Sequence, residues 1–414
     1  MEKLSAGRRR GALAALALGG FAVGLTEFAL MGLLPEVAHG LLPGDWARSP
    51  AGAVAHAGWL ITAYALGVVA GAPAIAAASA RVARKRLVAG LLVLFVVATA
   101  LTALAPTFGL VLVARFMAGL PHGAYFGAAG MVAASLLGPG NRAKGYAVVL
   151  GGLTVATVGG VPLVTALGQA TSWRVAYLVI TALFAVATAA VLVTVPAVSA
   201  GPGGSPRAEL RVFRAPQVWL VALIGTIGFA GFFAAYSFIA PVTTEVAGLP
   251  ASAVPWVLVA AGVGMTAGNL LGGVAADRSV RWAMLGGFAA LILASAAYGT
   301  LARSPAGLLA GAFAVGAAAL FLTPALQIRL IEVAPGAQLM GAAVNQSATN
   351  LANGIGAMLG GLAIGHGLGY LSPAWVGAGL GSAGLVLAAV SFRLDRPPAV
   401  GCRPRAGAAP MTRA

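Results

Sequence analysis

Two charged residues, Glu27 and Arg115, lie inside long apolar runs of this 414-residue chain. A charge within a membrane-spanning helix is costly, so it is by default a candidate functional residue. At 1.5 Å per residue, both lie roughly 12 Å below the same end of their runs. A buried carboxylate stays ionised beside a guanidinium and is driven toward protonation without one. If their helices are neighbours, the two residues have the chemistry of a proton switch; a static ion pair that fixes the two helices is the alternative.

His122 follows Arg115 by seven residues, which places it on nearly the same helix face, two turns deeper. Histidine titrates near neutral pH and can relay protons. A hydrogen-bonded packing histidine fits the sequence equally well.

Two further groups of side chains are candidates for a substrate cavity. The first is a stripe of polar residues at three- and four-residue spacing, which puts them on one helix face: Asn345, Gln346, Thr349, Asn350 and Asn353. These amides can bond to other helices or contact substrate. The second is aromatic, and within it Phe232 and Tyr236 can contact an apolar substrate or can be ordinary packing residues.

The composition indicates the elements that position these residues. The chain is 60% hydrophobic and 8% charged, with a mean hydropathy of +0.96, far from the roughly 25% charged residues of soluble domains. It is an all-α integral membrane protein. Its net charge of +16 comes from short basic clusters between apolar runs, and no nucleic-acid recognition motif accompanies them. Membrane orientation explains this excess better than a nucleic-acid partner does.

At about 20 residues per span, the sequence predicts twelve transmembrane helices. Their predicted ranges are 11–34, 57–79, 87–105, 108–136, 146–168, 175–195, 217–241, 254–276, 283–301, 306–330, 339–364 and 374–392. With an even count, most Lys and Arg residues in the loops fall on the side of both termini, and only Arg48, Arg174 and Arg303 fall on the other. The positive-inside rule then predicts that both termini are cytoplasmic.

A Gly- and Pro-rich stretch at 196–216 has the composition of a flexible linker. It separates a first six-helix bundle, 1–195, from a second, 217–392, and a polar tail, 393–414, follows. Two bundles with a cavity between them are the architecture of many secondary transporters. A weak internal repeat supports this division, since Gly67 and Gly71 in the second predicted span correspond to Gly268 and Gly272 in the eighth.

Several motifs together resemble the major facilitator superfamily, and within it the drug:proton antiporter branch near the arabinose-efflux and chloramphenicol-resistance permeases. They are Thr26-Glu27-Phe28, Arg115 with Gly119, His122 and Gly123, Gly159-Gly160-Val161-Pro162, Gly268-Asn269 with Asp277-Arg278, and Asn345-Gln346-Ser347. The resemblance covers essentially the whole chain. It implies that the helices of Glu27 and Arg115 are neighbours, and it names no substrate.

The resemblance also implies a conformational gate at the cytoplasmic loops, carried here by Arg81, Arg84, Asp277 and Arg278. The superfamily usually has an acid in the first of these loops. Here 76–86 keeps the basic residues and lacks that acid, which puts the first-half gate in doubt.

The leading interpretation is a proton-coupled exporter, acting by alternating access on a small, partly apolar molecule such as a drug, an antibiotic or another metabolite. A sugar or nucleoside exporter and an uncoupled facilitator are alternatives within the same fold. The sequence has no P-loop, no HExxH motif and a single cysteine, Cys402, so we expect no enzyme activity, cofactor or metal. The expected partners are substrate, protons and lipid, in a monomer of a bacterial inner membrane.

Overall fold

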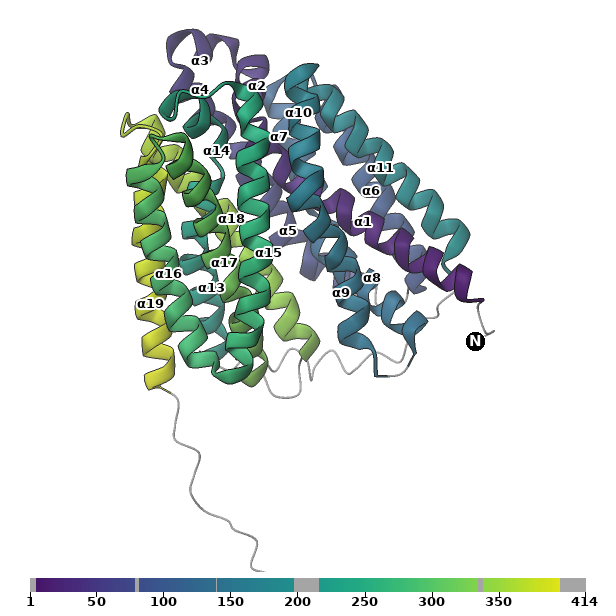
Figure 1. The fold of residues 1–414 in the computed structure, drawn as a ribbon. Helices are drawn as coiled ribbons and strands as arrows, with labels where there is room; N and C mark the ends of the chain where they lie inside the picture. Colours follow the sequence, from purple (N-terminus) through teal and green to yellow (C-terminus); the bar gives the residue numbers. More distant parts are fainter. Residues whose placement is uncertain (1–4, 79–81, 139, 197–215, 334–337, 395–414) are drawn as a thin grey trace, which may run out of the picture.

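The computed structural model describes residues 5–78, 82–138, 140–196, 216–333 and 338–394. In these residues the chain is helical, without strands, and forms two halves that stand side by side (Figure 1). Below, the lower end is the end of Figure 1 at which α1 begins and α19 ends, and the upper end is the opposite one.

The first half crosses the molecule six times and adds three short helices at the upper end. Its helices are α1 (Ala6–Gly32), α2 (Leu34–Leu41), α3 (Pro43–Arg48), α4 (Pro50–Ala57), α5 (Trp59–Ala78), α6 (Arg84–Leu104), α7 (Phe108–Gly119), α8 (His122–Leu137), α9 (Arg142–Val155), the π-helical η1 (Ala156–Gly160), α10 (Val161–Ala170) and α11 (Trp173–Thr194).

The second half also crosses six times. Its helices are α13 (Pro216–Tyr236), α14 (Ile239–Pro241), the π-helical η3 (Val242–Val246), the 3₁₀-helical η4 (Ala251–Ala253), α15 (Val254–Arg278), α16 (Val280–Leu301), α17 (Pro305–Val333), α18 (Gln338–Gly365) and α19 (Ser372–Arg393). Within the described residues, ten helices of the chain are individually long and apolar enough to span a membrane. The pair α7–α8 and the polar-striped α18 supply the other two crossings.

Two predicted spans differ from the structure because their helices break. The predicted span 108–136 is two helices, interrupted at Leu120 and Pro121, since proline has no N–H to give to the preceding turn. In the predicted span 217–241, the regular α-helix ends at Tyr236. The predicted span 57–79 corresponds to the continuous helix α5, and the short α4, which was not predicted, precedes it and has Gly58 as its C-cap. The short α2 and α3 were not predicted.

Glycines set the closest helix contacts in both halves. A Cβ atom on Gly67 of α5 would lie 2.1 Å from the carbonyl oxygen of Phe116 in α7, and one on Gly268 of α15 would lie 2.0 Å from that of Ala317 in α17. Only hydrogen fits such gaps, so both helix pairs depend on glycine. The repeated glycines therefore lie at equivalent helix pairs of the two halves, α5–α7 in the first and α15–α17 in the second.

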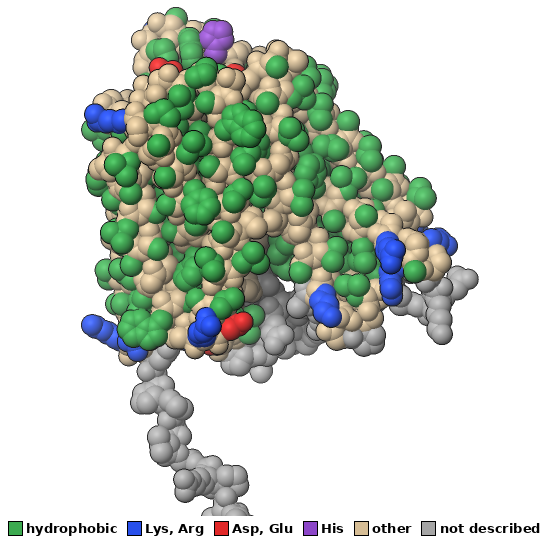
Figure 2. Space-filling view, in the orientation of Figure 1, with side chains coloured by type: hydrophobic (Ala, Val, Ile, Leu, Met, Phe, Trp, Pro, Cys, Tyr) green, Lys and Arg blue, Asp and Glu red, His purple; other side chains and the backbone are tan. Residues whose placement is uncertain are grey.

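The two halves meet at the upper end and at mid-depth. At the upper end the Phe238 ring lies close to Gly58, and Gly361 lies close to the backbone of Ala55. Nearer the middle, Gly262 of α15 approaches the backbone of Thr157 in η1. Toward the lower end the halves diverge in Figure 1, and Figure 2 shows a hollow between them there. The structure is therefore closed at its upper end and open at its lower end.

The surface has the pattern expected of a membrane protein. In Figure 2, apolar side chains cover the side of the molecule, and Lys and Arg gather toward its lower end. Tryptophans near both ends are largely exposed: Trp59, Trp256 and Trp375 near the upper end, and Trp219 and Trp282 near the lower end. Indole rings in these positions fit the two headgroup regions of a bilayer.

Candidate functional site

Arg115 is fully buried on α7 and reaches across to α1. Its Nη1 donates to the carbonyl oxygen of Thr26 at 2.8 Å and lies 3.3 Å from the Thr26 hydroxyl. The guanidinium also lies over the Tyr64 ring of α5, 4.4 Å from the ring centre, a cation–π contact that partly replaces lost water. Arg115 Nε and Nη2 have no hydrogen-bond partner among the described residues. The helices of Glu27 and Arg115 are thus neighbours at matching depth, as the sequence analysis expected.

Glu27 is also buried, at 6% exposed, but it faces the other half of the molecule. Its Oε1 accepts a hydrogen bond of 3.4 Å from Nδ2 of Asn353 on α18. No ion pair joins Glu27 to Arg115 in the described structure. The reason is helix geometry, because consecutive residues point about 100° apart around an α-helix. Arg115 reaches the face of Thr26, whereas Glu27 faces the seam between the halves.

His122 begins α8 and forms a second polar bridge across the seam. It is fully buried, with the Tyr64 hydroxyl 2.8 Å from Nδ1 and the Gln346 side-chain amide 3.1 Å from Nε2. When the amide of Gln346 donates to Nε2, Nδ1 carries the ring proton and donates to the Tyr64 oxygen. His122 is therefore a hydrogen-bonded histidine at the seam. Tyr64 links it to Arg115.

Tyr64 was not identified from the sequence as a site residue, although its position in the sequence indicates a buried partner for its hydroxyl. A tyrosine in the interior of a membrane span needs a partner for its hydroxyl. Tyr64 lies three residues before Gly67, on a helix that packs closely against the helix of Arg115. Those two facts together favour a contact with Arg115 or His122.

The polar stripe on α18 bonds mainly to other helices. Asn345 donates to Gln327 of α17 at 2.8 Å, and Asn350 donates to the Gln346 carbonyl within α18 at 3.0 Å. Asn353 bonds to Glu27, as described above, and Thr349 is partly buried. Of the two interpretations of the stripe, interhelical bonding accounts for these contacts in this conformation.

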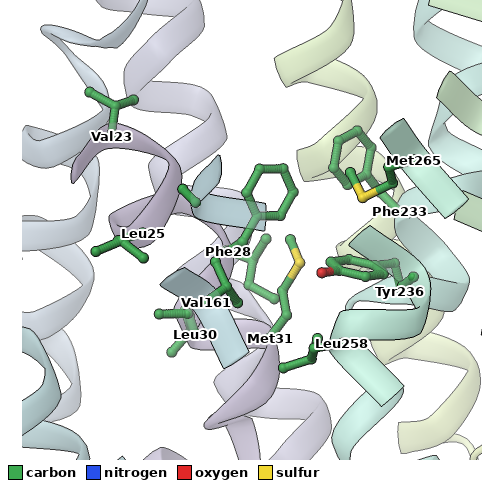
Figure 3. Packing of buried hydrophobic residues seen from close by; sticks show 14 of the residues in the cluster. Val23, Leu25, Phe28, Leu30, Met31, Val161, Phe233, Tyr236, Leu258 and Met265 are labelled. Carbon is green, nitrogen blue, oxygen red and sulfur yellow. The ribbon is translucent and has the colours of Figure 1, made fainter. Parts of the chain in front are cut away.

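The aromatic candidates form part of the seam close to Glu27. Phe232 stacks on Tyr236 with 5.1 Å between ring centres, and Tyr236 meets the edge of Phe28 from α1 at 6.0 Å. In Figure 3, the Tyr236 side chain extends from the second half toward α1, which carries Phe28 and Met31. Leu258 lies next to Met31 in the same view. The Tyr236 hydroxyl is buried and has no hydrogen-bond partner among the described residues.

The gate candidates lie apart from this cluster. Arg81 lies outside the described residues. Arg84 begins α6, and Asp277 and Arg278 are exposed at the lower end of α15. The structure therefore brings together Glu27, Arg115, His122, Phe232, Tyr236 and Asn353, and it leaves Arg84, Asp277 and Arg278 at the lower end.

Two helical halves, an open lower end and polar bridges buried at the seam define the architecture of a secondary transporter. The chain belongs to the Major Facilitator Superfamily, whose model matches residues 16–256 and 233–413. It is thus a transporter rather than an enzyme, and a multi-pass protein of the inner membrane.

Individual relatives are similar along nearly their whole length. The chain is 35% identical to the inner membrane transport protein YdhP of Escherichia coli K12, over 92% of this chain and 96% of YdhP. It is 32% identical to a chloramphenicol resistance protein of Streptomyces lividans, over 91% and 95% of the two chains. Among solved structures, the inward-facing, unoccupied form of a bacterial homologue of the human lysosomal transporter Spinster superposes with a TM-score of 0.70 at 17% identity, covering 94% of this chain and 96% of that one.

Proposed function

We propose that this protein is a proton-coupled exporter of a small, partly apolar molecule, acting as a monomer with both termini in the cytoplasm. The observation that carries the proposal is the position of Glu27. Among the acidic residues that the structure describes, Glu27 is the one that is buried within the membrane-spanning bundle, and it lies at the seam that must open and close during alternating access.

The contacts of Glu27 suit reversible protonation. The ionised carboxylate accepts a hydrogen bond from the Asn353 amide nitrogen. The side-chain amide oxygen of Asn353, Oδ1, is buried and has no hydrogen-bond partner among the described residues, so a protonated Glu27 can donate to it after a small rotation of either side chain. Both protonation states therefore have a partner, and neither leaves a charge stranded, which would cost several kcal/mol.

Arg115 supports this role without neutralising the carboxylate. Its guanidinium is held by the Thr26 carbonyl and the Tyr64 ring, so it remains a fixed positive charge near Glu27. Movement of α18 relative to α1 changes the contacts of Glu27 and leaves those of Arg115 in place. Proton release is thereby tied to the movement of the two halves, because the hydrogen-bond partner of Glu27, Asn353, belongs to the second half, whereas Arg115 and its contacts belong to the first.

The aromatic cluster supports an apolar component in the substrate. Phe28, Phe232 and Tyr236 present ring surface on both sides of the seam, and transporter cavities of this kind bind such molecules by ring contacts with a few polar groups. The similarity to a chloramphenicol resistance protein supports export of an antibiotic or a related compound.

The test compares Glu27→Gln with Glu245→Gln, an exposed acid at the upper end. Substrates are first found by a resistance and accumulation screen in a host that lacks its own exporters. Transport is then measured in proteoliposomes with and without a pH gradient. We expect Glu27→Gln to lose gradient-driven transport and keep substrate exchange, while Glu245→Gln keeps both. Gradient-driven transport by well-expressed Glu27→Gln would refute the proposed coupling, and wild-type transport indifferent to the gradient would show a facilitator.

A further inference from the structure

The lower end of the first half carries positive charge that the described acids of that half do not neutralise. Its basic residues lie in the opening turns of α1, α6 and α9: Arg8, Arg9, Arg10, Arg84, Lys85, Arg86, Arg142 and Lys144. The acids described in the same half lie at mid-depth, as Glu27 does, or at the upper end, as Glu36 and Asp45 do. This end of the half therefore attracts anions.

Two contacts place two of these basic turns beside the lower end of α11. Lys85 Nζ of α6 donates to the carbonyl oxygen of Leu192, in the last turn of α11, at 2.7 Å. On the side of α1, a Cβ atom on Gly11 would lie 3.7 Å from Cγ2 of Thr194, the last residue of α11. Figure 2 shows Lys and Arg side chains in this region, where α1 begins and α11 ends in Figure 1. The lower end of α11 thus lies between the basic turns of α6 and α1.

Above this basic region, α11 and α6 present apolar faces. The exposed residues of α11 recur at three- and four-residue spacing and so share one face: Val175, Leu178, Val179, Ala182, Ala185, Val186, Ala189, Leu192 and Val193. The exposed residues of α6 do the same: Gly90, Val93, Val97, Leu101 and Leu104.

The two helices pack against each other, and a cation lies at the foot of their exposed surface. The rings of Phe95 on α6 and Phe184 on α11 stack with 4.6 Å between their centres. Arg86 is exposed one turn below Gly90, so it extends the exposed face of α6 to the lower end. An apolar surface with Lys85 and Arg86 at its foot therefore faces the bilayer.

We propose that the lower ends of α6 and α11 form a binding site for an anionic phospholipid, whose phosphate lies at Lys85 and Arg86 and whose acyl chains lie along the apolar faces above them. The Lys85 ammonium has three donors, of which one is directed to Leu192. Arg86 takes part in no ion pair with a described residue, and a guanidinium can give a phosphate two parallel hydrogen bonds.

The surrounding charge selects an anionic headgroup. Leu192 and Thr194 lie about 200° apart around the α11 axis, so Arg8, Arg9 and Arg10 approach α11 from another side than Lys85 and act on the phosphate through their field. Each Lys or Arg next to the membrane favours an anionic lipid about fivefold. A zwitterionic headgroup brings an ammonium group that this field repels. A free phosphate ion has the same headgroup chemistry but no chains to cover the apolar faces.

The site is tested with a fluorescent label on the α11 face. Full-length protein with Ala189→Cys and Cys402→Ser carries a bimane label and is reconstituted in phosphatidylcholine vesicles, to which brominated phosphatidylglycerol or brominated phosphatidylcholine is added as quencher. We expect the phosphatidylglycerol to quench more strongly at equal mole fraction. In Arg86→Gln its preference should fall about fivefold, and in Arg86→Lys most of it should remain. Inorganic phosphate, at matched ionic strength, should not displace the lipid.

The matched control is Arg281→Gln, which removes an exposed cation at the lower end of the second half, at the start of α16. Equal quenching by the two lipids in the parent protein overturns the site, as does an equal loss of preference in Arg86→Gln and Arg281→Gln, which would show a general surface potential. Loss of the preference in inorganic phosphate would assign the cations to the free ion, and shielding of the label from both lipids would assign the face to a second copy of the chain; either overturns the lipid site. Unfolding midpoints equal to that of the parent protein confirm that the variants are folded, and no result depends on proton coupling through Glu27.

Discussion

Two adjacent glycines on α15 offer a sharp test of how the second half is packed. A Cβ atom on Gly272 would lie 2.2 Å from the carbonyl oxygen of Phe321 in α17, and 2.8 Å from two further backbone atoms of the same residue. A Cβ atom on Gly273 would meet nothing within 4 Å. Gly272→Ala and Gly273→Ala therefore make the same chemical change, one residue apart, in opposite environments.

The expected magnitude follows from these distances. The atoms that Gly272→Ala would overlap belong to a helix backbone, which cannot rotate aside, so α15 and α17 must separate by about 1 Å. Overpacking of this kind costs about 1–3 kcal/mol. Replacing a glycine within a helix by alanine stabilises the helix by up to about 1 kcal/mol, because alanine has the higher helix propensity. Because the propensity gain applies to both variants, we expect Gly273→Ala to be neutral or stabilising, and Gly272→Ala to be less stable than it by the overpacking cost of about 1–3 kcal/mol.

The assay is thermal unfolding in detergent at one scan rate. Near a midpoint, 1 kcal/mol corresponds to about 2–4 °C for a unit of 150–250 residues, the size of one half, so a difference of about 1–3 kcal/mol corresponds to roughly 2–12 °C between the two variants. Gly152→Ala and Gly151→Ala repeat the comparison in the first half, where a Cβ on Gly152 would lie 2.0 Å from the Ala17 carbonyl oxygen and one on Gly151 would meet nothing. Equal midpoints within each pair would refute the packing described here.

Three further predictions concern polar groups. Arg174→Ala should lower stability by about 1–3 kcal/mol, measured by the same unfolding assay, because Arg174 Nη1 donates to the carbonyl oxygens of Ala103 and Ala105 at 2.7 and 2.8 Å; a midpoint equal to wild type would contradict this. Tyr236→Phe should leave stability unchanged or slightly higher, since the Tyr236 hydroxyl has no partner among the described residues; a loss above about 1 kcal/mol would reveal a bond to that hydroxyl. The contacts of Asp45 stabilise the fold above its unfolded pKa of about 3.9. Because the hydrogen bond from His56 lowers the folded pKa of Asp45, this small contribution is lost as the pH falls from about 3.9 through the folded value. The midpoint difference between wild type and Asp45→Asn should therefore shrink as the pH is lowered below about 3.9, and a difference that does not change with pH across the acid range would refute the assignment.

The fold was predictable because the bilayer leaves few alternatives. Apolar runs of about 20 residues must be helices, since every backbone group needs a partner inside the membrane. The positions of Glu27 and Arg115 followed from residue counting along those helices. The breaks at Leu120 and Pro121, and at Tyr236, were not predicted. Proline is tolerated within membrane helices, so its presence does not decide between a kink and an end.

The partners of the buried charges were harder to predict than their depth. Depth depends on residue count, whereas the choice of partner depends on rotation about the helix axis, which sequence periodicity fixes only to within a residue. Thr26 and Glu27 are adjacent, yet one bonds to Arg115 and the other to Asn353. The stripe on α18 included Asn353 and Gln346, but a list of amides on one face does not say which of them reach across to the other half.

The two polar bridges at the seam, Glu27–Asn353 and His122–Gln346, lie near mid-depth, so the contacts at the upper end are farther from them and move more when the halves rotate. Gly361, which contacts the first half at the upper end, lies eight residues beyond Asn353 on α18, an arm of roughly 12 Å. A rocking rotation of about 15° would move that contact by about 3 Å relative to the bridges, which is enough to admit water. The cost of opening the upper end therefore falls on small, apolar contacts that exchange readily, and the smaller displacement at the bridges is the movement that changes the contact between Glu27 and Asn353.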